Sequence, residues 1–204
     1  MKKEKLIKKY DKHVKIYENN ISNPTLANWR SKIIPHAYGK VLEVGVGVGA
    51  NFPFYQKENV AITAVDFSQE MVRSAEQTAQ YYSLDVNFLV KDVRDLQFEP
   101  NSFDCIVSTL TLCSYPDPIN VLNKFHEWCN KDGQVLLMEH GLSSLTSISL
   151  LQKFIDPLFV KVAGCHCNRN IIELIEQSNL QINKVERNMK DIIYLIWAQA
   201  GEIK

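Results

Sequence analysis

A glycine-rich segment at residues 41–51, VLEVGVGVGAN, most constrains how this chain can fold. Its first four residues are β-branched or apolar apart from one acid, which is typical of the end of a buried parallel strand. Glycines then alternate at positions 45, 47 and 49, and without Cβ atoms the backbone there can turn sharply and approach a ligand. From Asn51 onward we expect a helix whose free N–H groups face that ligand.

A second strand, predicted at residues 61–65, ends in Asp66. A carboxylate at the tip of this strand is placed to accept hydrogen bonds from a ribose diol, so the unit is predicted to bind a nucleoside. Two ligand classes remain open. Gly45, Gly47 and Ala50 match the dinucleotide fingerprint G-x-G-x-x-G/A, whereas Glu43 and the three glycines spell E-x-G-x-G-x-G. The remaining alternative is a glycine-rich turn without a ligand.

Size and charge narrow the function classes. The 204 residues, 46% of them hydrophobic, suffice for one α/β domain spanning 1–204 with a sizeable core. Basic and acidic residues number 23 each, so the formal net charge is zero and we expect no nucleic-acid partner. Lysines cluster within residues 2–15, where a solvated helix face is a simpler interpretation than a binding patch.

The cysteines and the apolar runs predict a cytoplasmic protein. There are five cysteines, an odd number, and no C-x-x-C pair, which suits reduced thiols better than a disulfide framework. The charged N-terminus does not resemble a secretory signal. No apolar run reaches the ~18 residues that span a bilayer, so only peripheral membrane contact remains open.

Periodicity along the chain predicts alternating strands and helices as far as residue 140, and hence a parallel sheet. A short connection at 189–191 then joins the last two strands as an antiparallel hairpin. The expected fold is therefore a seven-stranded, mostly parallel sheet with helices on both faces. Residues 1–38 supply N-terminal helices, and residues 142–170 form an inserted segment that covers the substrate. Helices are expected at 2–19, 25–37, 69–82, 116–129, 147–162 and 170–178, and the remaining strands at 86–90, 103–112, 134–139, 181–188 and 192–199.

With this fold, E-x-G-x-G-x-G resembles motif I of the class I S-adenosylmethionine (SAM) methyltransferases, and too few residues remain for the substrate domain of a dehydrogenase. The resemblance covers about residues 10–200. Broadly, the chain is similar to the ubiquinone/menaquinone C-methyltransferases and bacterial phosphatidylethanolamine N-methyltransferases. More closely, it resembles the animal methyltransferase-like alkyl-thiol methyltransferases, which begin with a membrane-anchoring apolar segment that this sequence does not show. That closer match rests on VLEVGVGVGANFPFY (41–55), STLTLCSYPDP (108–118), LLMEHG (136–141) and DPLFVKVAGCHCNR (156–169).

The resemblance implies SAM as cofactor, S-adenosylhomocysteine as product and a set of binding residues. Asp66 would hold the ribose, and Asp92 with the Val93 amide would hold the adenine amino group. Phe67 and Met71 would flank the adenine, although Met71 could equally belong to the core. The amino-acid and methyl end would involve Glu43, Gly45, Gly47, Gly49, Asn51, Ser108, Thr109 and Thr111, the last of which could instead simply pack.

Candidate residues near the acceptor include one base. Methyl transfer is an in-line displacement, and a thiol acceptor with a pKa of about 8.5 needs little help to ionise. His140 is the leading base candidate because it follows the fifth strand at the carboxyl edge of the sheet. A histidine hydrogen-bonded for structure is the alternative. Tyr10, His13 and Tyr17 could close over the cofactor or be ordinary amphipathic surface.

Two further features remain. Cys165-His166-Cys167 invites a zinc interpretation, but its ligands are adjacent and no second pair has zinc-site spacing, so we expect no metal and a pocket-lining role. The apolar segment 147–162 could be core, lid or membrane-touching surface, and we favour lid plus core. The predicted function is SAM-dependent methyl transfer to a small, fairly apolar acceptor, with a thiol favoured over a phospholipid amine or a quinone. The rival from another class is a non-catalytic SAM-binding regulator.

Overall fold

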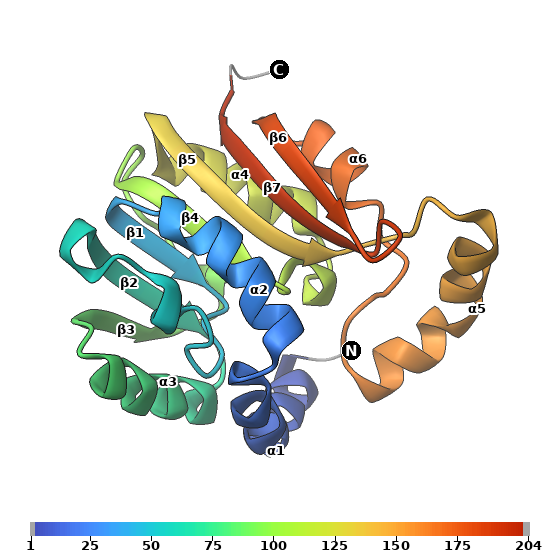
Figure 1. Ribbon diagram of the computed structural model, residues 1–204, viewed down its shortest axis with the longest axis horizontal. Helices are drawn as coiled ribbons and strands as arrows, with labels where there is room; N and C mark the ends of the chain where they lie inside the picture. Colours follow the sequence, from blue (N-terminus) through green and yellow to red (C-terminus); the bar gives the residue numbers. More distant parts are fainter. Residues whose placement is uncertain (1–2, 202–204) are drawn as a thin grey trace.

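The computed structural model describes residues 3–201, whose strands form one seven-stranded sheet in the order β3-β2-β1-β4-β5-β7-β6 (Figure 1). Strands β1 to β5 run parallel, and β7 pairs antiparallel with both β5 and β6. This confirms the predicted fold class. The strands are β1 (Gly39–Val44), β2 (Val60–Asp66), β3 (Val86–Val90), β4 (Phe103–Thr109), β5 (Cys129–His140), β6 (Leu180–Asn188) and β7 (Ile193–Ala200).

Side-chain caps set the starts of several helices. Ser68 accepts a hydrogen bond from the Met71 amide, as predicted, whereas Asn170 rather than the predicted Asn168 caps α6. Residue 2, the expected first residue of the N-terminal helix, lies outside the described residues. The helices are α1 (Lys3–Ile21), α2 (Pro24–Ile33), α3 (Gln69–Tyr82), α4 (Pro118–Trp128), α5 (Thr146–Val162) and α6 (Ile171–Glu176).

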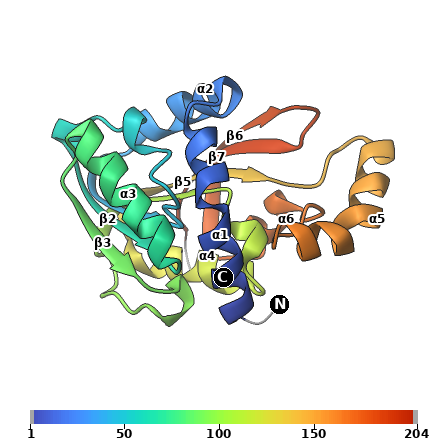
Figure 2. The same ribbon diagram turned by 90° about the horizontal axis from the view of Figure 1, so that it is seen from below.

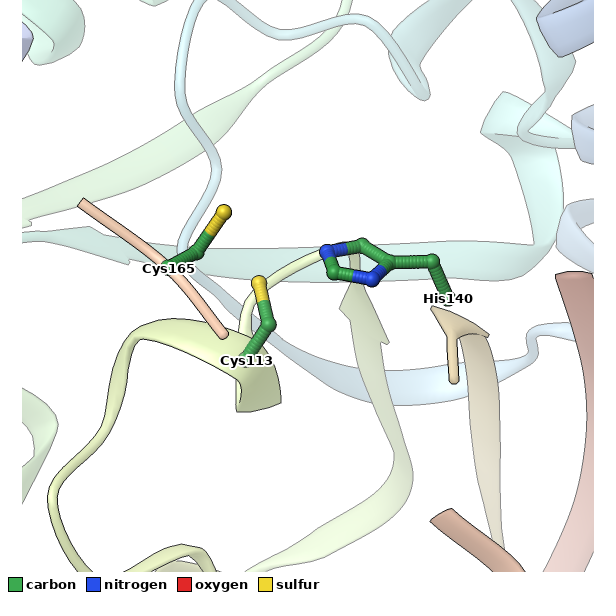
Figure 3. A group of neighbouring side chains, drawn as sticks. All are labelled: Cys113, His140 and Cys165. Atoms are coloured by element: carbon green, nitrogen blue, oxygen red, sulfur yellow. The ribbon is translucent and has the colours of Figure 1, made fainter. Parts of the chain in front are cut away.

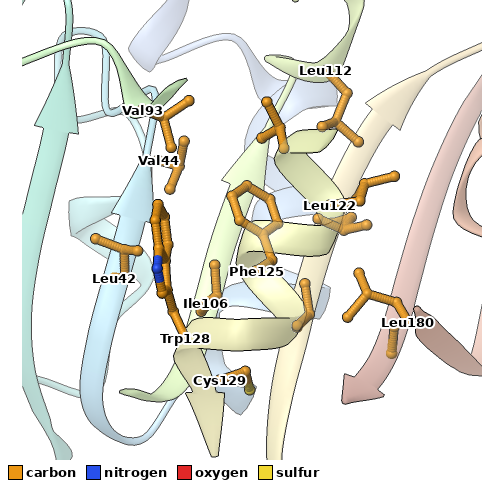
Figure 4. Close-up of a cluster of buried hydrophobic side chains, with 14 of the residues drawn as sticks. Leu42, Val44, Val93, Ile106, Leu112, Leu122, Phe125, Trp128, Cys129 and Leu180 are labelled. Carbon is orange, nitrogen blue, oxygen red and sulfur yellow. The ribbon is translucent and has the colours of Figure 1, made fainter. Parts of the chain in front are cut away.

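The sheet is buried on both faces by two apolar layers. Leu42 of β1 belongs to the layer under α4 and α6, where Phe125 and Trp128 pack against the sheet (Figure 4). Val41, its neighbour in the strand, points to the opposite layer under α2 and α3. Both side chains are 0% exposed, which explains why the strand reads as a continuous apolar run.

Local departures from the predicted elements follow from specific residues. The chain after Asn51 forms only a 3-10 turn, Phe52–Phe54, so the predicted helix there is wrong. It leaves the turn in extended conformation because Phe52 and Tyr55 are both drawn into the core. Strand β4 ends at Thr109, short of the predicted 112, because Leu110 adopts a φ of 58°. Strand β5 begins at Cys129, earlier than the predicted residue 134. It continues through residues 132–133, where a turn was expected.

Helix α5 stands at the edge of the molecule, beyond α6 (Figures 1 and 2). Only Gln152 and Asp156 are buried along it, while Phe154 is 86% exposed. The prediction that this segment belongs to the core is therefore wrong, because its apolar face meets no layer of the described chain. Within residues 3–201, no helix combines the length and apolar character needed to cross a bilayer.

Candidate functional site

A cavity opens where β1, β2 and β4 end, between the glycine loop and the first two helices. The carboxyl edge of a parallel sheet is where open α/β folds bind their ligands. Asp66 and Phe67 contribute from the end of β2, Thr109 from the end of β4, and Tyr10 and Tyr17 from α1. Several of the predicted cofactor residues therefore lie around one hollow.

The three loop glycines have different roles. All have positive φ, which favours glycine. A Cβ atom at Gly45 would collide with the Thr111 side chain, and one at Gly49 would lie 2.6 Å from the Phe52 ring. At Gly47 it would meet no atom of the described chain within 4 Å. Gly45 and Gly47 line the cavity, so Gly47 provides the open backbone approach and Gly49 allows the loop to pack.

Asp66 is fixed by the backbone on both sides. Its Oδ2 accepts from the Gly47 amide and its Oδ1 from the Ser68 amide, both at 2.9 Å. Burial raises the pKa of Asp66 to about 6, against the lowering effect of these hydrogen bonds. The carboxylate lines the cavity, and a carboxylate has acceptor sites enough to take further hydrogen bonds, which fits acceptance from ribose hydroxyls.

Glu43 lies behind the cavity rather than in its wall. It is 1% exposed, and its two oxygens accept from Asn51 Nδ2 at 2.9 Å and Tyr55 Oη at 2.8 Å. Burial raises the pKa of Glu43 to about 7, opposed by these hydrogen bonds and by the charge of Arg30. Asn51 does line the cavity and also donates to Thr109 Oγ1. Glu43 therefore positions Asn51 and makes no direct contact with the hollow.

Arg30 is a cavity residue that the sequence analysis missed. Its Nε donates to Asn51 Oδ1 at 3.1 Å, while its Nη1 is buried and has no hydrogen-bond partner among the described residues. Burial lowers the pKa of Arg30, which the charge of Glu43 counteracts. A buried guanidinium nitrogen in a cavity wall fits an anionic ligand group such as a carboxylate. The only sequence signal was an arginine on the helix before the glycine strand, which is too common to single out.

The predicted adenine side is only partly assembled around this cavity. Phe67 and Met71 line it, and Tyr10 of α1 packs edge-on against Phe67 at 5.3 Å. Asp92 instead accepts from Arg94 at 2.6 and 2.9 Å and borders an adjoining small hollow that also contains Phe67. The Val93 side chain is buried in the core, and the contact of its backbone amide with the adenine stays a prediction.

Helix α1 contributes to the wall of the cavity. Three of its residues were candidates for covering the cofactor, and two of them lie at the cavity. Tyr10 and Tyr17 line the hollow with ring centroids 6.0 Å apart, whereas His13 is not among the lining residues. Burial raises the pKa of Tyr10, and the neighbouring Tyr17, Cys113 and Cys165 add to this effect. Both tyrosines thus line the cavity and lie near the two thiols, which also add to the effect of burial in raising the pKa of Tyr17.

At the methyl end, a buried acid organises the turn after β4. Glu139 Oε1 accepts from the Thr111 amide at 3.0 Å and the Leu112 amide at 3.2 Å, and burial raises its pKa to about 7. Thr109 and Thr111 line the cavity. Ser108 is fully buried and bonds to Thr111 Oγ1, so it supports the wall from behind.

His140 stands beside two thiols rather than alone at the sheet edge. One ring nitrogen, Cys113 Sγ and Cys165 Sγ all lie within 4.8 Å of one another (Figure 3). The Cys113 hydrogen bond lowers the pKa of Cys165 to about 5, and His140 adds to this against the effect of burial. Burial would lower the pKa of His140, but its interactions with Cys165 raise it overall. The His140 imidazole therefore interacts with Cys165.

The Cys165-His166-Cys167 triplet diverges in the structure. His166 Nδ1 bonds to Asp156 Oδ2 at 2.9 Å, and the Cys167 thiol points to the Gln152 carbonyl at 3.5 Å. Only Cys165 turns toward the site. Gln152 and Asp156 thereby attach α5 to this loop, although no residue of α5 lines the cavity in the described part of the chain.

Comparison with known proteins finds methyltransferases. A methyltransferase-domain model matches residues 42–137, from β1 to β5. The chain is 29% identical over 146 residues to the phosphatidylethanolamine N-methyltransferase of Cereibacter sphaeroides, covering 71% of each protein. It is 30% identical over 154 residues to the thiol S-methyltransferase TMT1B of Rattus norvegicus, covering 72% of this chain and 62% of the relative.

These matches support a SAM-dependent methyltransferase of class I. A solved structure of the geranyl diphosphate C-methyltransferase of Streptomyces coelicolor A3(2), with S-adenosylhomocysteine bound, shares the fold at a TM-score of 0.68 and 11% identity, covering 86% of this chain and 75% of that one. The cofactor of this methyltransferase is SAM, and the cavity residues fit it: Gly47 leaves room, Asp66 offers an acceptor, and Arg30 Nη1 is a buried donor that no residue in 3–201 satisfies.

Proposed function

We propose that this methyltransferase transfers the methyl group of SAM to a small, fairly apolar thiol. The observation that carries the proposal is the cluster of Cys113, His140 and Cys165 beside the cavity, a setting in which an acceptor thiol is readily ionised. The similarity to a thiol S-methyltransferase, over more than two thirds of this chain, supports the same acceptor class.

In the proposed arrangement, each end of the cofactor meets a different wall. Arg30 holds the carboxylate of the amino-acid end, and the Gly47 backbone approaches the cofactor without a side chain between them. Asp66 accepts from the ribose hydroxyls, and Phe67 with Met71 flanks the base. When bound, SAM supplies a methyl group activated by a positively charged sulfur.

The residues of the chain then align the acceptor and exclude water. Alignment for in-line displacement can be worth about 7–11 kcal/mol, so a small thiol needs little further help once it is ionised. Tyr10 and Tyr17 separate the cavity from solvent along α1. His140 promotes ionisation of the acceptor thiol, and it acts through the cluster because its ring nitrogen lies within 4.8 Å of the Cys165 sulfur.

A phospholipid amine is the second candidate acceptor. The similarity to a phosphatidylethanolamine N-methyltransferase favours it, together with the exposed apolar face of α5, which would suit a lipid surface. That face carries Leu150, Leu151, Phe154, Leu158 and Val162. We retain residues 142–170 as a substrate cover in this proposal. We also retain a cytoplasmic location, which the five free cysteines support.

Two measurements test the proposed function. Titration calorimetry should show binding of SAM and S-adenosylhomocysteine and none of NAD. A panel of alkyl thiols, phospholipid amines and quinones, scored by release of S-adenosylhomocysteine, should then show turnover with thiols. Turnover restricted to amines or quinones would indicate a phospholipid or quinone methyltransferase instead. SAM binding without turnover of any acceptor would favour a non-catalytic regulator.

A further inference from the structure

The strongest unassigned feature is the convergence of Cys113, His140 and Cys165 (Figure 3). They come from three separate segments: the turn after β4, the end of β5, and the loop after α5. Their ligand atoms lie within 4.8 Å of one another, and Cys113 is 2% exposed. Two sulfurs and one imidazole nitrogen therefore surround a single partly buried point.

The loop that carries Cys165 is pinned to the turn that carries Cys113. The His166 amide donates to the Cys113 carbonyl at 2.9 Å. Arg169 donates to the carbonyls of Leu112 and Tyr115, each at 2.5 Å. Since His166 and Arg169, which follow Cys165 in the loop, are both bonded to the turn around Cys113, the two thiols keep their relative position without a ligand.

From this geometry we propose that Cys113, His140 and Cys165 form a binding site for one divalent cation of the zinc type. Thiolate and imidazole are the ligands that Zn²⁺ selects in proteins, whereas Mg²⁺ and Ca²⁺ prefer oxygen. The positive charge of the cation is balanced by the two thiolates. This replaces the sequence expectation of no metal, which considered Cys165 only with its neighbours in the chain.

The number of protein ligands indicates a catalytic rather than a structural site. Structural zinc sites use four protein ligands, while catalytic ones use three and leave a position for water or substrate. Within the described chain, this group offers three. Thr111 and Ser114, on either side of Cys113, line the cofactor cavity. The open position is therefore expected to face the acceptor.

This step rests on the proposed thiol acceptor. An acceptor thiol takes the open position as a thiolate, and its S–H proton passes to solvent. The sulfur then forms a bond to the methyl carbon while the carbon–sulfur bond of the sulfonium breaks, which yields a thioether and neutral S-adenosylhomocysteine. Coordination thus supplies the ionisation that the sequence analysis assigned to His140 as a free base.

The cation site is tested by metal content and titration on the full-length, reduced protein. Zn²⁺ should bind at one equivalent per chain, and Co²⁺ should give the thiolate charge-transfer bands of a tetrahedral site. Cys113→Ser, Cys165→Ser and His140→Ala should each weaken Zn²⁺ binding by more than the about 10–100-fold typical of losing an outer-shell partner. Cys167→Ser is the matched control, because it changes a cysteine of the same loop that points elsewhere, and it should bind like wild type.

Three results would overturn the site: no uptake of Zn²⁺ by reduced protein, equal affinity in the ligand variants and in Cys167→Ser, or a Cys113–Cys165 disulfide that persists under reducing conditions. The open position has its own readout. Adding an alkyl thiol to the Co²⁺ protein should shift the charge-transfer bands, and an unchanged spectrum would overturn that step. Since metal binding is measured without SAM, failure of the proposed function would appear separately, as absent SAM binding or absent thiol turnover.

Discussion

Arg30 and Asn51 are joined by a hydrogen bond of 3.1 Å from Nε to Oδ1, which leaves Nη1 of the arginine buried and unpaired by the described chain. Asn51 is itself held by Glu43, so the guanidinium is fixed in the cavity wall through a chain of two side chains. A buried donor without a partner is costly, and a bound carboxylate would satisfy it. The cavity wall thus carries a positive group that the described chain leaves unpaired, at the place where the cofactor's acidic end is expected.

Replacing Arg30 should weaken SAM binding. The variant Arg30→Gln keeps hydrogen-bonding capacity but loses the charge, and hydrogen bonds to charged groups contribute about 1.5–3 kcal/mol. Calorimetry should therefore show a dissociation constant about 10-fold or more above wild type. Arg73→Gln, on the exposed surface of α3, is the control. Equal affinities in a folded Arg30→Gln protein would remove this residue from the cofactor site.

Asp66→Ala should also weaken SAM binding, for a different reason. The variant removes the acceptor that faces the ribose and frees the Gly47 and Ser68 amides. We expect a loss on the order of 1.5–3 kcal/mol in binding free energy. Asp85→Ala changes an exposed acid and should leave affinity unaltered. A dissociation constant that stays at the wild-type value, with normal thermal unfolding, would place the ribose elsewhere.

The sequence predicted those parts of the fold that are determined by residues close together in the chain. The strand residues 41–44 and the glycine loop follow from local composition, as does the cap at Ser68, whereas the strand itself begins earlier, at Gly39. The 3-10 turn after Asn51 was missed because burial of Phe52 and Tyr55 outweighed the local tendency of a glycine loop to open a helix. The order of the strands in the sheet is set by pairing between segments that lie far apart in the chain. Only that pairing brings these segments to one edge of the sheet.

Long-range contacts explain what was missed in the site. The Cys113, His140 and Cys165 cluster is invisible in sequence because its members belong to three segments with no common spacing. The Arg30 contact likewise depends on how α2 packs over the glycine loop. For α5, the apolar periodicity was real, but periodicity does not say whether a face meets core, partner or solvent.

Glu43 should make the stability of the protein depend on pH. Its folded pKa of about 7 lies above the ordinary glutamate value of 4.5, so the folded state binds this proton more tightly than the unfolded state. The resulting stabilisation is complete below the unfolded pKa and is lost as pH rises through the folded one. Unfolding in urea, compared at about pH 5 and about pH 8, should show a change on the order of 1–3 kcal/mol that Glu43→Gln reduces. Glu58→Gln, on the surface, should retain the wild-type pH dependence.

Gln152 should control the attachment of α5. Its Nε2 donates to the carbonyls of Gly141 and Cys167, and its Oε1 accepts from the Ser143 amide at 2.8 Å. Gln152→Ala leaves these buried groups unpaired, at about 1–3 kcal/mol of local stability. Hydrogen exchange of the Ser143 amide should accelerate while SAM affinity stays constant. Gln177→Ala is a surface control, and equal exchange in both variants would show that other contacts hold this segment.

His140→Ala should lower the turnover rate for thiols while SAM affinity stays nearly constant, because His140 is not among the residues that line the cofactor cavity. The physical reason is that the acceptor then ionises without help from the cluster, whether that help is direct or through a bound cation. As pH rises toward the thiol pKa of about 8.5, the acceptor ionises unaided, so the deficit should shrink. General-base assistance is typically worth ~10²–10⁴-fold, and an acidic thiol should fall below that range. His126→Ala, whose ring bonds to the Gly201 carbonyl far from the cavity, is the control. A His140→Ala enzyme with the wild-type pH–rate profile would contradict the assignment, as would an acceptor panel in which no thiol turns over.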